Sequence, residues 1–341
     1  MRVSILGLPG SGRETVFRAL TGLSPSGQNE VRLGEALVSD PRLDKLSAIY
    51  KPRKHTPARV ELSLPKVQGE PSEALKASLE KARDADCLLV VLRGFPLLDG
   101  SEPDPAKEAA LLESELKVAD YLVVSKRLER LAEDKKRGKA PDPEEKGLLE
   151  ASLASLEADK PIRLLPEAAQ SPKLRGYGLL SAKPALAVVN LPDEAQGEPQ
   201  GGPFPDGLSL VSLKGRLEEE FSQLSPEEAQ ELMGEYGLAE LASAKVARAL
   251  YQLNNLISFF TVGEDECRAW TVKAGDSALE AAGKIHSDIK RGFIRAEVVA
   301  YGDLEAAGGS MAEAKKKGLV RLEGKTYKMA DGDVVLFRFN V

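Results

Sequence analysis

Short apolar runs alternate with amphipathic segments through most of the chain. Continuous apolar runs without polar alternation are typical of strands that are buried on both faces of a sheet. DCLLVVLR at residues 86–93 and KPALAVVN at residues 183–190 are two clear examples. The same reasoning predicts shorter strands at residues 1–6, 59–64 and 208–213.

Helix-patterned segments lie between these runs. Val16, Ala19 and Leu20 recur at helical spacing and predict a helix over residues 15–21, and residues 72–84 form another such segment. Strands that alternate with helices indicate a parallel sheet with crossover helices. We therefore expect an α/β fold.

The alternation of strands and helices stops in the middle of the chain. Residues 106–136 form a long charged helical segment, and a turn at GKAPDP leads to a second one at residues 144–158. This arrangement predicts an antiparallel, coiled-coil-like helical hairpin inserted into the sheet domain. A Gly/Pro-rich loop follows at residues 196–205.

The hydrophobic pattern changes again in the last third of the chain. Residues 225–256 open with the capping pattern Ser-Pro-Glu-Glu and predict a helical stretch. From Ser258 onward, short alternating strands with one helix near residues 277–285 predict a small separate β-rich domain.

A glycine-rich loop joins the first predicted strand to the first predicted helix. This strand–loop–helix context is what a Walker A phosphate loop requires. Glycines let successive backbone N–H groups turn inward and meet an anion at a helix N-terminus. A loop retained for folding alone is an equally good interpretation. The nucleotide-binding candidates are Gly7, Leu8, Pro9, Gly10, Ser11, Gly12, Arg13, Glu14 and Thr15.

Two positions of this loop depart from the Walker A pattern. Arg13 replaces the usual lysine, and its wide planar fork is a poor substitute at a tight site. Glu14 replaces the hydroxyl residue that normally binds Mg²⁺. A carboxylate about 4 Å from a phosphate, at an effective dielectric of about 20, costs about 4 kcal/mol.

Glu14 therefore has two interpretations. It is a candidate metal ligand, or it takes the place of a phosphate at the positive end of the helix dipole. Thr15 carries a hydroxyl, but it lies one residue later and is turned by about 100° around the helix.

Nearly the whole chain resembles the YchF / Obg-like ATPase family, a branch of the translation-factor GTPase class. The similar segments are GLPGSGRETVFRALTG, DPRLDKLSAIYKP, LLSAKPAL, ALYQLNNLISFFTVG and the tail from RAWTVKAGD to DGDVVLFRFNV. The resemblance implies a P-loop NTPase parallel sheet with an inserted helical hairpin and a C-terminal TGS (β-grasp-like) domain. It also implies binding of ATP or GTP with Mg²⁺ and association with ribosomes or RNA.

Two switch segments also depart from the family pattern. The segment before DPRLD is shortened and lacks threonine. The place of the Asp-x-x-Gly switch is taken by Glu61-Leu62-Ser63-Leu64, which has no glycine. Glu61 is the second metal candidate after Glu14. These departures argue against efficient hydrolysis.

The base-recognition segment leaves ATP and GTP open. Guanine readers carry Asn-Lys-x-Asp after a buried strand, whereas the resembled family has Glu at the fourth place. Here Asn190 and Asp193 hold the guanine-reading spacing, Glu194 lies one residue beyond, and Leu191 replaces the lysine. Ser212 fits the last base-contacting loop, although a plain turn is an equal interpretation.

Composition and charge limit the partners and the cellular compartment that we expect for the protein. The chain has 341 residues, 42% of them hydrophobic and 29% charged, and its net charge is -6. We expect any nucleic-acid partner to meet a local basic patch, since the overall field is negative. The two cysteines, Cys87 and Cys267, predict no disulfide framework and a reducing cytoplasm. No apolar run approaches the length that spans a bilayer.

The C-terminal part carries the densest basic material. Its candidate RNA- or ribosome-binding residues are Lys284, Lys290, Arg291 and Arg295, and ordinary surface is an equal interpretation. His286 is expected to be structural or RNA-facing, and His55 to lie in an exposed loop. Spacing gives neither histidine a triad partner.

These observations predict four segments and three functions. The segments are an NTPase domain at residues 1–102 and 181–256, a hairpin at 103–180 and a TGS-like domain at 257–341. The leading hypothesis is a ribosome-associated purine nucleotide-binding protein with weak or lost hydrolysis. The alternatives are a nucleotide-free pseudo-NTPase that serves as an RNA adaptor, and an active ATPase that uses Glu14 as a metal ligand.

Overall fold

The computed structural model describes residues 1–23, 31–66, 70–195 and 203–340. Parts of the shortened switch segment and of the Gly/Pro-rich loop, and Val341, lie outside these residues. The chain divides into two compact units, Met1–Ala36 with Glu61–Val246 and Leu37–Val60 with Ala247–Val341. Within the described ranges, no helix is long and apolar enough to cross a membrane.

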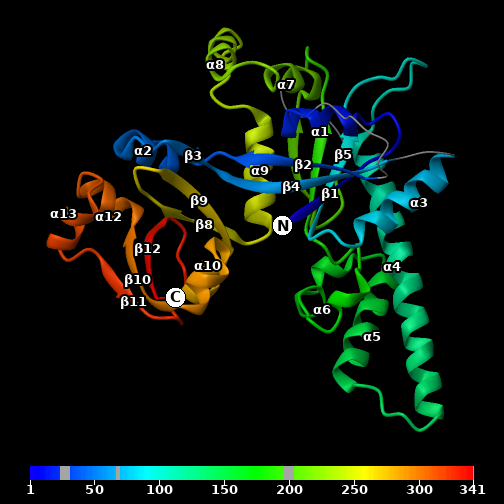
Figure 1. Cartoon of the computed structure of the whole chain (residues 1–341). Coiled ribbons are helices and arrows are strands. Elements are labelled where there is room, and N and C mark those ends of the chain that lie inside the picture. Colours follow the sequence, from blue (N-terminus) through cyan, green and yellow to red (C-terminus); the bar gives the residue numbers. More distant parts are fainter. Residues whose placement is uncertain (24–30, 67–69, 196–202, 341) are drawn as a thin grey trace. The chain divides into compact units, whose positions relative to one another are not determined.

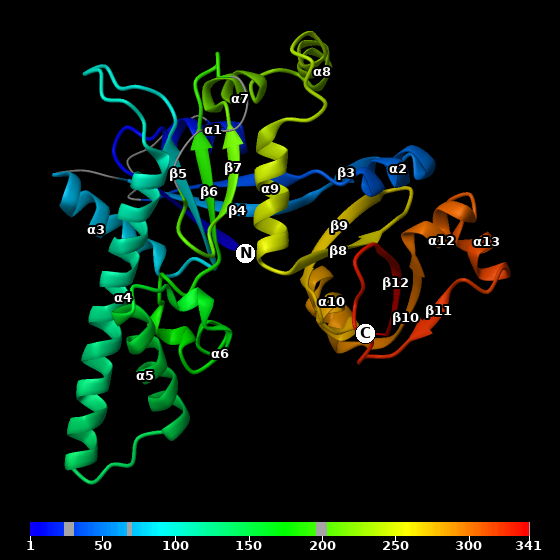
Figure 2. The same ribbon diagram turned by 180° about the vertical axis from the view of Figure 1, so that it is seen from behind.

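The first sheet has the strand order β2-β4-β1-β5-β6-β7 (Figures 1 and 2). The pairs β1·β4, β1·β5, β5·β6 and β6·β7 are all parallel, which confirms the predicted α/β arrangement. All residues of the two longest apolar runs that lie in strands are buried, as expected for central strands. The strands are β1 (Arg2–Leu6), β2 (Val31–Val38), β4 (Ala58–Pro65), β5 (Cys87–Arg93), β6 (Ala185–Asn190) and β7 (Ser209–Leu213).

Helices pack on this sheet through a continuous apolar core. Leu88 and Leu92 of β5 share that core with Leu79 of α3 (Pro71–Ala82) and with Leu112 and Leu116 of α4 (Pro105–Lys136). The helices of this part are α1 (Arg13–Thr21), α3 (Pro71–Ala82), α7 (Gly215–Phe221), α8 (Pro226–Glu235) and α9 (Ala242–Leu253).

The stretch predicted as one helical segment over residues 225–256 is two helices followed by a strand. Gly237 takes a left-handed φ of 63° between α8 and α9, which ends the first helix. The Glu218 carboxylate then accepts hydrogen bonds from the backbone N–H groups of Ala242 and Ser243, at 2.6 and 3.0 Å. A side chain from α7 therefore caps α9, and local sequence could not show this.

The predicted helical hairpin is formed by α4 (Pro105–Lys136) and α5 (Pro143–Glu157), which lie side by side in Figure 1. Asp104 and Asp142 cap the two helices, and a proline follows each aspartate at the first helical position. Shorter helical turns complete this region: η1 (Ile162–Leu164), α6 (Pro166–Ala169) and η2 (Arg175–Tyr177).

A buried carboxylate fastens the hairpin to the sheet. Asp120 of α4 accepts hydrogen bonds from the backbone N–H groups of Leu180 and Ser181, at 2.8 and 2.6 Å, and from the Ser181 hydroxyl at 2.7 Å. Burial raises the pKa of Asp120, whereas these hydrogen bonds and the Arg83 guanidinium lower it. The chain that leaves the hairpin is thereby held against α4 just before β6.

The second unit is built on a sheet with the order β11-β10-β12-β8-β9-β3. Ala278, Ala281 and Ala282 of α10 pack with Phe259 and Phe337 in its core. Four helices in the described part replace the single predicted one, since short turns also form at α11, α12 and α13. The bounds are β8 (Leu256–Thr261), β9 (Glu266–Lys273), α10 (Ala278–Ile285), α11 (Ser287–Arg291), β10 (Phe293–Ala300), α12 (Tyr301–Ala306), α13 (Met311–Lys316), β11 (Arg321–Glu323) and β12 (Asp333–Phe339).

An early segment of the chain contributes to this second unit. It contains α2 (Pro41–Tyr50) and β3 (Lys54–Thr56), and β3 pairs in parallel with β9. The expected exposed loop around His55 is therefore an edge strand, although the His55 side chain is exposed as expected. A three-residue strand that pairs with a partner over 200 residues away has no local signal of its own.

Candidate functional site

The glycine-rich loop runs from the end of β1 to the start of α1. Gly10 and Gly12 have left-handed φ angles of 83° and 84°, where a side chain is strained. A Cβ on Gly7 would lie 2.6 Å from the Val91 carbonyl oxygen. No side chain caps the N-terminus of α1 at Gly12. The first N–H groups of this helix are therefore directed at whatever occupies the loop.

Arg13 lies across the beginning of this loop. Its Cδ would be 3.1 Å from a Cβ on Gly7, so the side chain folds back over the loop. Burial lowers the pKa of Arg13, and Glu14 opposes that shift. Its guanidinium makes no hydrogen bond or ion pair with the residues that the structure describes. A half-buried cation without a partner is costly unless an anion binds beside it.

Ser11 provides a second unsatisfied polar group. The residue is 1% exposed, and its hydroxyl has no hydrogen-bond partner among the described residues. That hydroxyl lies 2.7 Å from the position of a Cβ on Gly7, inside the curve of the loop. Buried polar groups without partners are uncommon in native proteins and point to a missing ligand or water.

Glu14 does not stand alone beside the loop. Its carboxylate lies 3.0 Å from the Arg32 guanidinium of β2 and 3.8 Å from that of Arg18, one helical turn away. Arg18 also pairs with Glu219 of α7 at 2.7 Å. The charge of Glu14 is therefore partly offset by two arginines, one in the same helix and one on a neighbouring strand.

Asn190 fixes the loop to the neighbouring strand end. Its amide Nδ2 donates to the Ser11 carbonyl oxygen, and its Oδ1 accepts from the Gly215 N–H, both at 3.1 Å. A Cβ on Gly12 or on Gly215 would come within 2.1 Å or 2.5 Å of this amide. Both ends of the Asn190 side chain are thus used to hold backbone segments together.

Asp193 and Lys214 are also engaged by the protein. The Asp193 carboxylate accepts from the Leu217 N–H in the first turn of α7, at 3.2 Å. Lys214 donates to the Asp193 carbonyl oxygen at 2.8 Å. Ser212 is half-buried in β7, where it pairs with Val189. The structure brings Asn190 to the phosphate loop and directs the Asp193 carboxylate to a helix N-terminus.

The loop after β5 covers part of the same region. The buried Arg93 guanidinium donates to the carbonyl oxygens of Phe95, Ser101 and Glu102 at 2.8–3.0 Å. It also pairs with Glu108 of α4 at 3.2 Å. Leu97, which this loop carries, would lie 3.3 Å from a Cβ on Gly10. An arginine at the end of β5 therefore shapes the wall above the phosphate loop.

The two metal candidates are not brought together. Glu61 pairs in strand register with Arg2, and its carboxylate binds the Arg2 guanidinium. Arg2 begins β1, whereas the phosphate loop begins five residues later, about 16 Å along a strand. In the ranges that the structure covers, no group of three acidic, His or Cys side chains could hold a metal ion. The Glu14 carboxylate beside the loop is paired with Arg32 and Arg18, so it does not offer Mg²⁺ the free carboxylate oxygen that this ion favours.

Comparison with known proteins places this site in a family. The chain is 34% identical to the Bacillus subtilis protein named ribosome-binding ATPase YchF, over 100% of both chains. It is 30% identical to Obg-like ATPase 1 of Oryza sativa, covering 92% of that protein. The chain belongs to the YchF / Obg-like ATPase family.

Structural similarity agrees with this assignment. The Schizosaccharomyces pombe YchF GTPase structure matches with a TM-score of 0.84 at 26% identity, covering 99% of this chain and 97% of that one. Residues 256–340 match the YchF-GTPase_C family model, described as a protein of unknown function (DUF933). The predicted α/β P-loop fold with a helical insertion and a C-terminal YchF domain is thus confirmed.

The YchF-type C-terminal part presents the basic residues predicted from the sequence. Lys284 lies on α10, Lys290 and Arg291 lie on α11, and Arg295 lies on β10; all four are exposed. Arg291 pairs with Asp288 at 2.8 Å. His286 caps α11, because its Nδ1 accepts from the Asp288 N–H at 3.1 Å.

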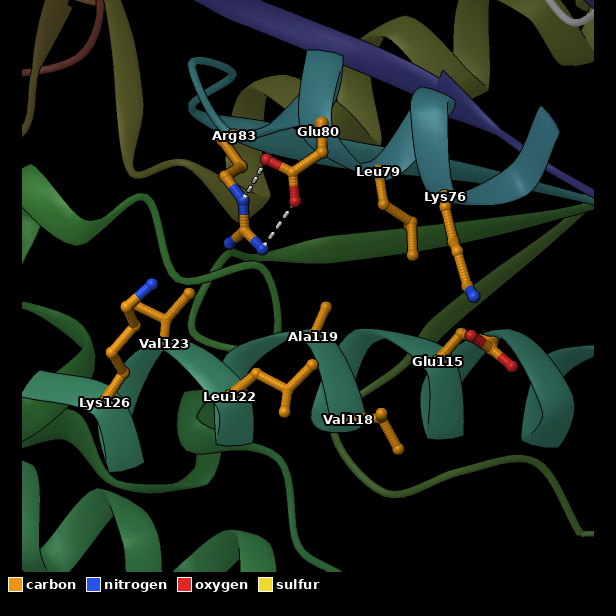
Figure 3. A pocket seen from close by; sticks show the side chains of 10 residues that line it. All are labelled: Lys76, Leu79, Glu80, Arg83, Glu115, Val118, Ala119, Leu122, Val123 and Lys126. Atoms are coloured by element: carbon orange, nitrogen blue, oxygen red, sulfur yellow. Dashed lines mark hydrogen bonds and ion pairs between the residues drawn. The ribbon is translucent and has the colours of Figure 1, made fainter. Parts of the chain in front are cut away.

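A hollow of about 380 Å³ lies between α3 and α4 in the first unit (Figure 3). Leu79 projects from α3 above it, and Val118 and Leu122 project from α4 below it. The Arg83–Glu80 ion pair closes one side. None of the phosphate-loop residues lines this hollow.

Several arginines that contact the predicted site residues or their loops were not predicted from the sequence. Arg18, Arg32 and Arg93 all take part in the site, and none belongs to a phosphate-binding motif. The only sequence signal for Arg18 is its i,i+4 spacing from Glu14. Arg32 and Arg93 reach the site only because the sheet places β2 and β5 there.

Proposed function

We propose that this YchF-family protein binds a purine nucleotide through the phosphate loop and acts at the ribosome, with weak or lost hydrolysis. The observation that carries the proposal is an unpaired Arg13 guanidinium beside an uncapped helix N-terminus. Backbone N–H groups and one cation are the elements that phosphate recognition requires. The relatives named as ATPases support the same conclusion.

Both ATP and GTP are expected to bind. The side chains that would discriminate between the bases, Asn190 and Asp193, already bind backbone groups of this protein. Recognition by phosphate contacts alone does not distinguish one base from the other. Ser212 remains a candidate base contact at the end of β7.

Weak hydrolysis follows from the side chains near the phosphate loop. Glu14 is held by two arginines, and Glu61 is level with Arg2 at the start of β1, five residues before the loop begins. Phosphoryl transfer depends on positioned charge and an oriented water. The described residues beside the loop supply cations, but they supply no free carboxylate to orient water. Mg²⁺ is not part of this proposal, because the Glu14 carboxylate beside the loop is already paired with arginines.

The ribosome part of the proposal rests on relatives named as ribosome-binding and on exposed cations in the second unit. Lys284, Lys290 and Arg295 form no ion pair with residues in the described ranges, so they are available to phosphates. A cytoplasmic setting is consistent with such a partner, and the two cysteines are free, buried thiols.

Calorimetry on nucleotide-stripped protein tests nucleotide binding. We expect micromolar binding of both ATP and GTP and a loss of about tenfold or more in Arg13→Ala. Arg137→Ala, which removes an exposed guanidinium from the hairpin, is the matched control and should leave binding unchanged. Absence of binding at millimolar nucleotide would overturn this part and leave the pseudo-NTPase adaptor.

Ribosome co-sedimentation tests the second part in the full chain. The triple change Lys284→Ala, Lys290→Ala and Arg295→Ala should weaken binding and reduce its salt slope by up to roughly three. Removing three exposed cations from the first unit, Lys126, Arg137 and Arg216, provides the charge-matched control. Equal losses in both variants would show that only net charge matters.

A further inference from the structure

We infer that the phosphate loop takes nucleotide phosphates without Mg²⁺, with arginine guanidinium groups supplying the positive charge. The inference rests on the proposed nucleotide binding and defines the form of ligand that the site accepts. Phosphate-loop proteins normally divide this charge between a lysine and a metal ion. The arrangement around Glu14 indicates that this chain does not.

Glu14, which stands at the metal-binding position of the loop, already forms ion pairs with two arginines. Arg32 lies 3.0 Å from one Glu14 oxygen, and Arg18 lies 3.8 Å from the other. A Mg²⁺ ion at this carboxylate would approach two guanidinium groups, so its binding would be opposed by like charge. Mg²⁺ also loses its water reluctantly and requires near-octahedral oxygen ligands.

The local charges favour an anion without added metal. Three guanidinium groups, those of Arg13, Arg18 and Arg32, face two carboxylates, those of Glu14 and Glu219. One positive charge is left over before any ligand binds. The Nε atoms of Arg18 and Arg32 are also buried and have no hydrogen-bond partner among the described residues.

No second acid in the described part of the chain completes a metal site. Glu61 is level with the first residue of β1 and binds Arg2. At the carboxyl end of β4, nearest the loop, the strand ends in Leu64 and Pro65, which offer no side-chain oxygen. Glu14 is therefore a positioning residue for Arg32 and Arg18, and it is not a metal ligand.

Calorimetric titration of the stripped full-length protein with ADP, in Mg²⁺ and in EDTA, tests this inference. We expect the two dissociation constants to agree within about threefold. Binding that is strengthened tenfold or more by Mg²⁺ would overturn the inference while leaving the proposed nucleotide binding intact. Absence of binding in both buffers would overturn both.

Glu14→Gln separates the two roles of this side chain, and its exposed position should allow the change without loss of the fold. If Glu14 does not ligate Mg²⁺, removing its negative charge from beside the phosphates should strengthen ADP binding about threefold to tenfold in both buffers. If Glu14 ligates Mg²⁺, the variant should bind ADP more weakly in Mg²⁺ than the wild type does. Glu133→Gln is the matched control, since Glu133 forms a similar i,i+4 pair with Arg137 at 3.7 Å.

Discussion

The two ends of the candidate nucleotide site differ in how their polar groups are used. At the phosphate end, the Ser11 hydroxyl and the Arg13 guanidinium have no partner among the described residues. At the base end, both functional groups of Asn190 and the carboxylate of Asp193 bind the backbone of the protein.

The contrast indicates that the phosphate end is built to bind a ligand, whereas the base-end side chains hold the fold together. Groups without partners lower their free energy when a ligand arrives, so the phosphate end gains most from binding. Side chains that already bind the backbone must give up those hydrogen bonds before they can form new ones with a ligand, so they gain little free energy from binding. Three substitutions test this difference between the two ends of the site.

Asn190→Ala should have the largest effect, and the effect should be on stability. The change leaves the Ser11 carbonyl and the Gly215 N–H without their partner in a buried site. We expect a loss of about 2–4 kcal/mol in the free energy of unfolding, measured by urea denaturation. Asn254→Ala removes one hydrogen bond, to the Leu250 carbonyl, and should cost less. Equal losses in the two variants would contradict a double anchoring role for Asn190.

Asp193→Ala should have a smaller effect, again mainly on stability. The carboxylate caps α7 through the Leu217 N–H, and losing such a cap costs about 1 kcal/mol. The ratio of ATP to GTP affinity should stay within about twofold of the wild type by calorimetry. Asp142→Ala removes a comparable cap from α5 and is the control. A tenfold shift in the nucleotide ratio would show that Asp193 reads the base.

Ser11→Ala should have the smallest effect, and its sign should be opposite. Its hydroxyl is buried without a partner, so its removal should raise the free energy of unfolding by up to about 1 kcal/mol. Ser63→Ala is the matched control, because Ser63 is also buried in this sheet but donates to the Val3 carbonyl. That variant should lose stability. A clear loss in Ser11→Ala, measured by thermal unfolding, would reveal a partner for the hydroxyl.

Most of the fold could be predicted from the sequence because its strands are continuous apolar runs. β5 and β6 are buried along their whole length, and such runs leave little choice of environment. Two features escaped prediction because their causes are distant in the chain. β3 exists through pairing with β9, and α9 begins where Glu218 of another helix caps it.

Less of the site could be predicted, for the same reason. The motif spacing identified Gly7, Gly10 and Gly12, whose backbone angles depend on the local sequence. The charge around Glu14 depends on Arg32, which lies on a neighbouring strand, and only the folded sheet reveals that pairing. The metal role predicted for Glu61 gains no support, because strand register places that residue level with Arg2.

The unbroken length of α4 gives the hairpin the properties of a lever. This helix has 32 residues and is therefore about 48 Å long. Its first turn is tied through Glu108 to Arg93, whose loop rests on the glycines that would hold phosphate. Asp120 fixes the middle of this helix to the backbone of Leu180 and Ser181, and 16 residues, or about 24 Å, extend beyond it. A tilt of about one degree about that point moves the far end by about 0.4 Å. The first turn lies at a similar distance on the other side of the anchor, so a movement at the loop would be reproduced at the tip at about the same size.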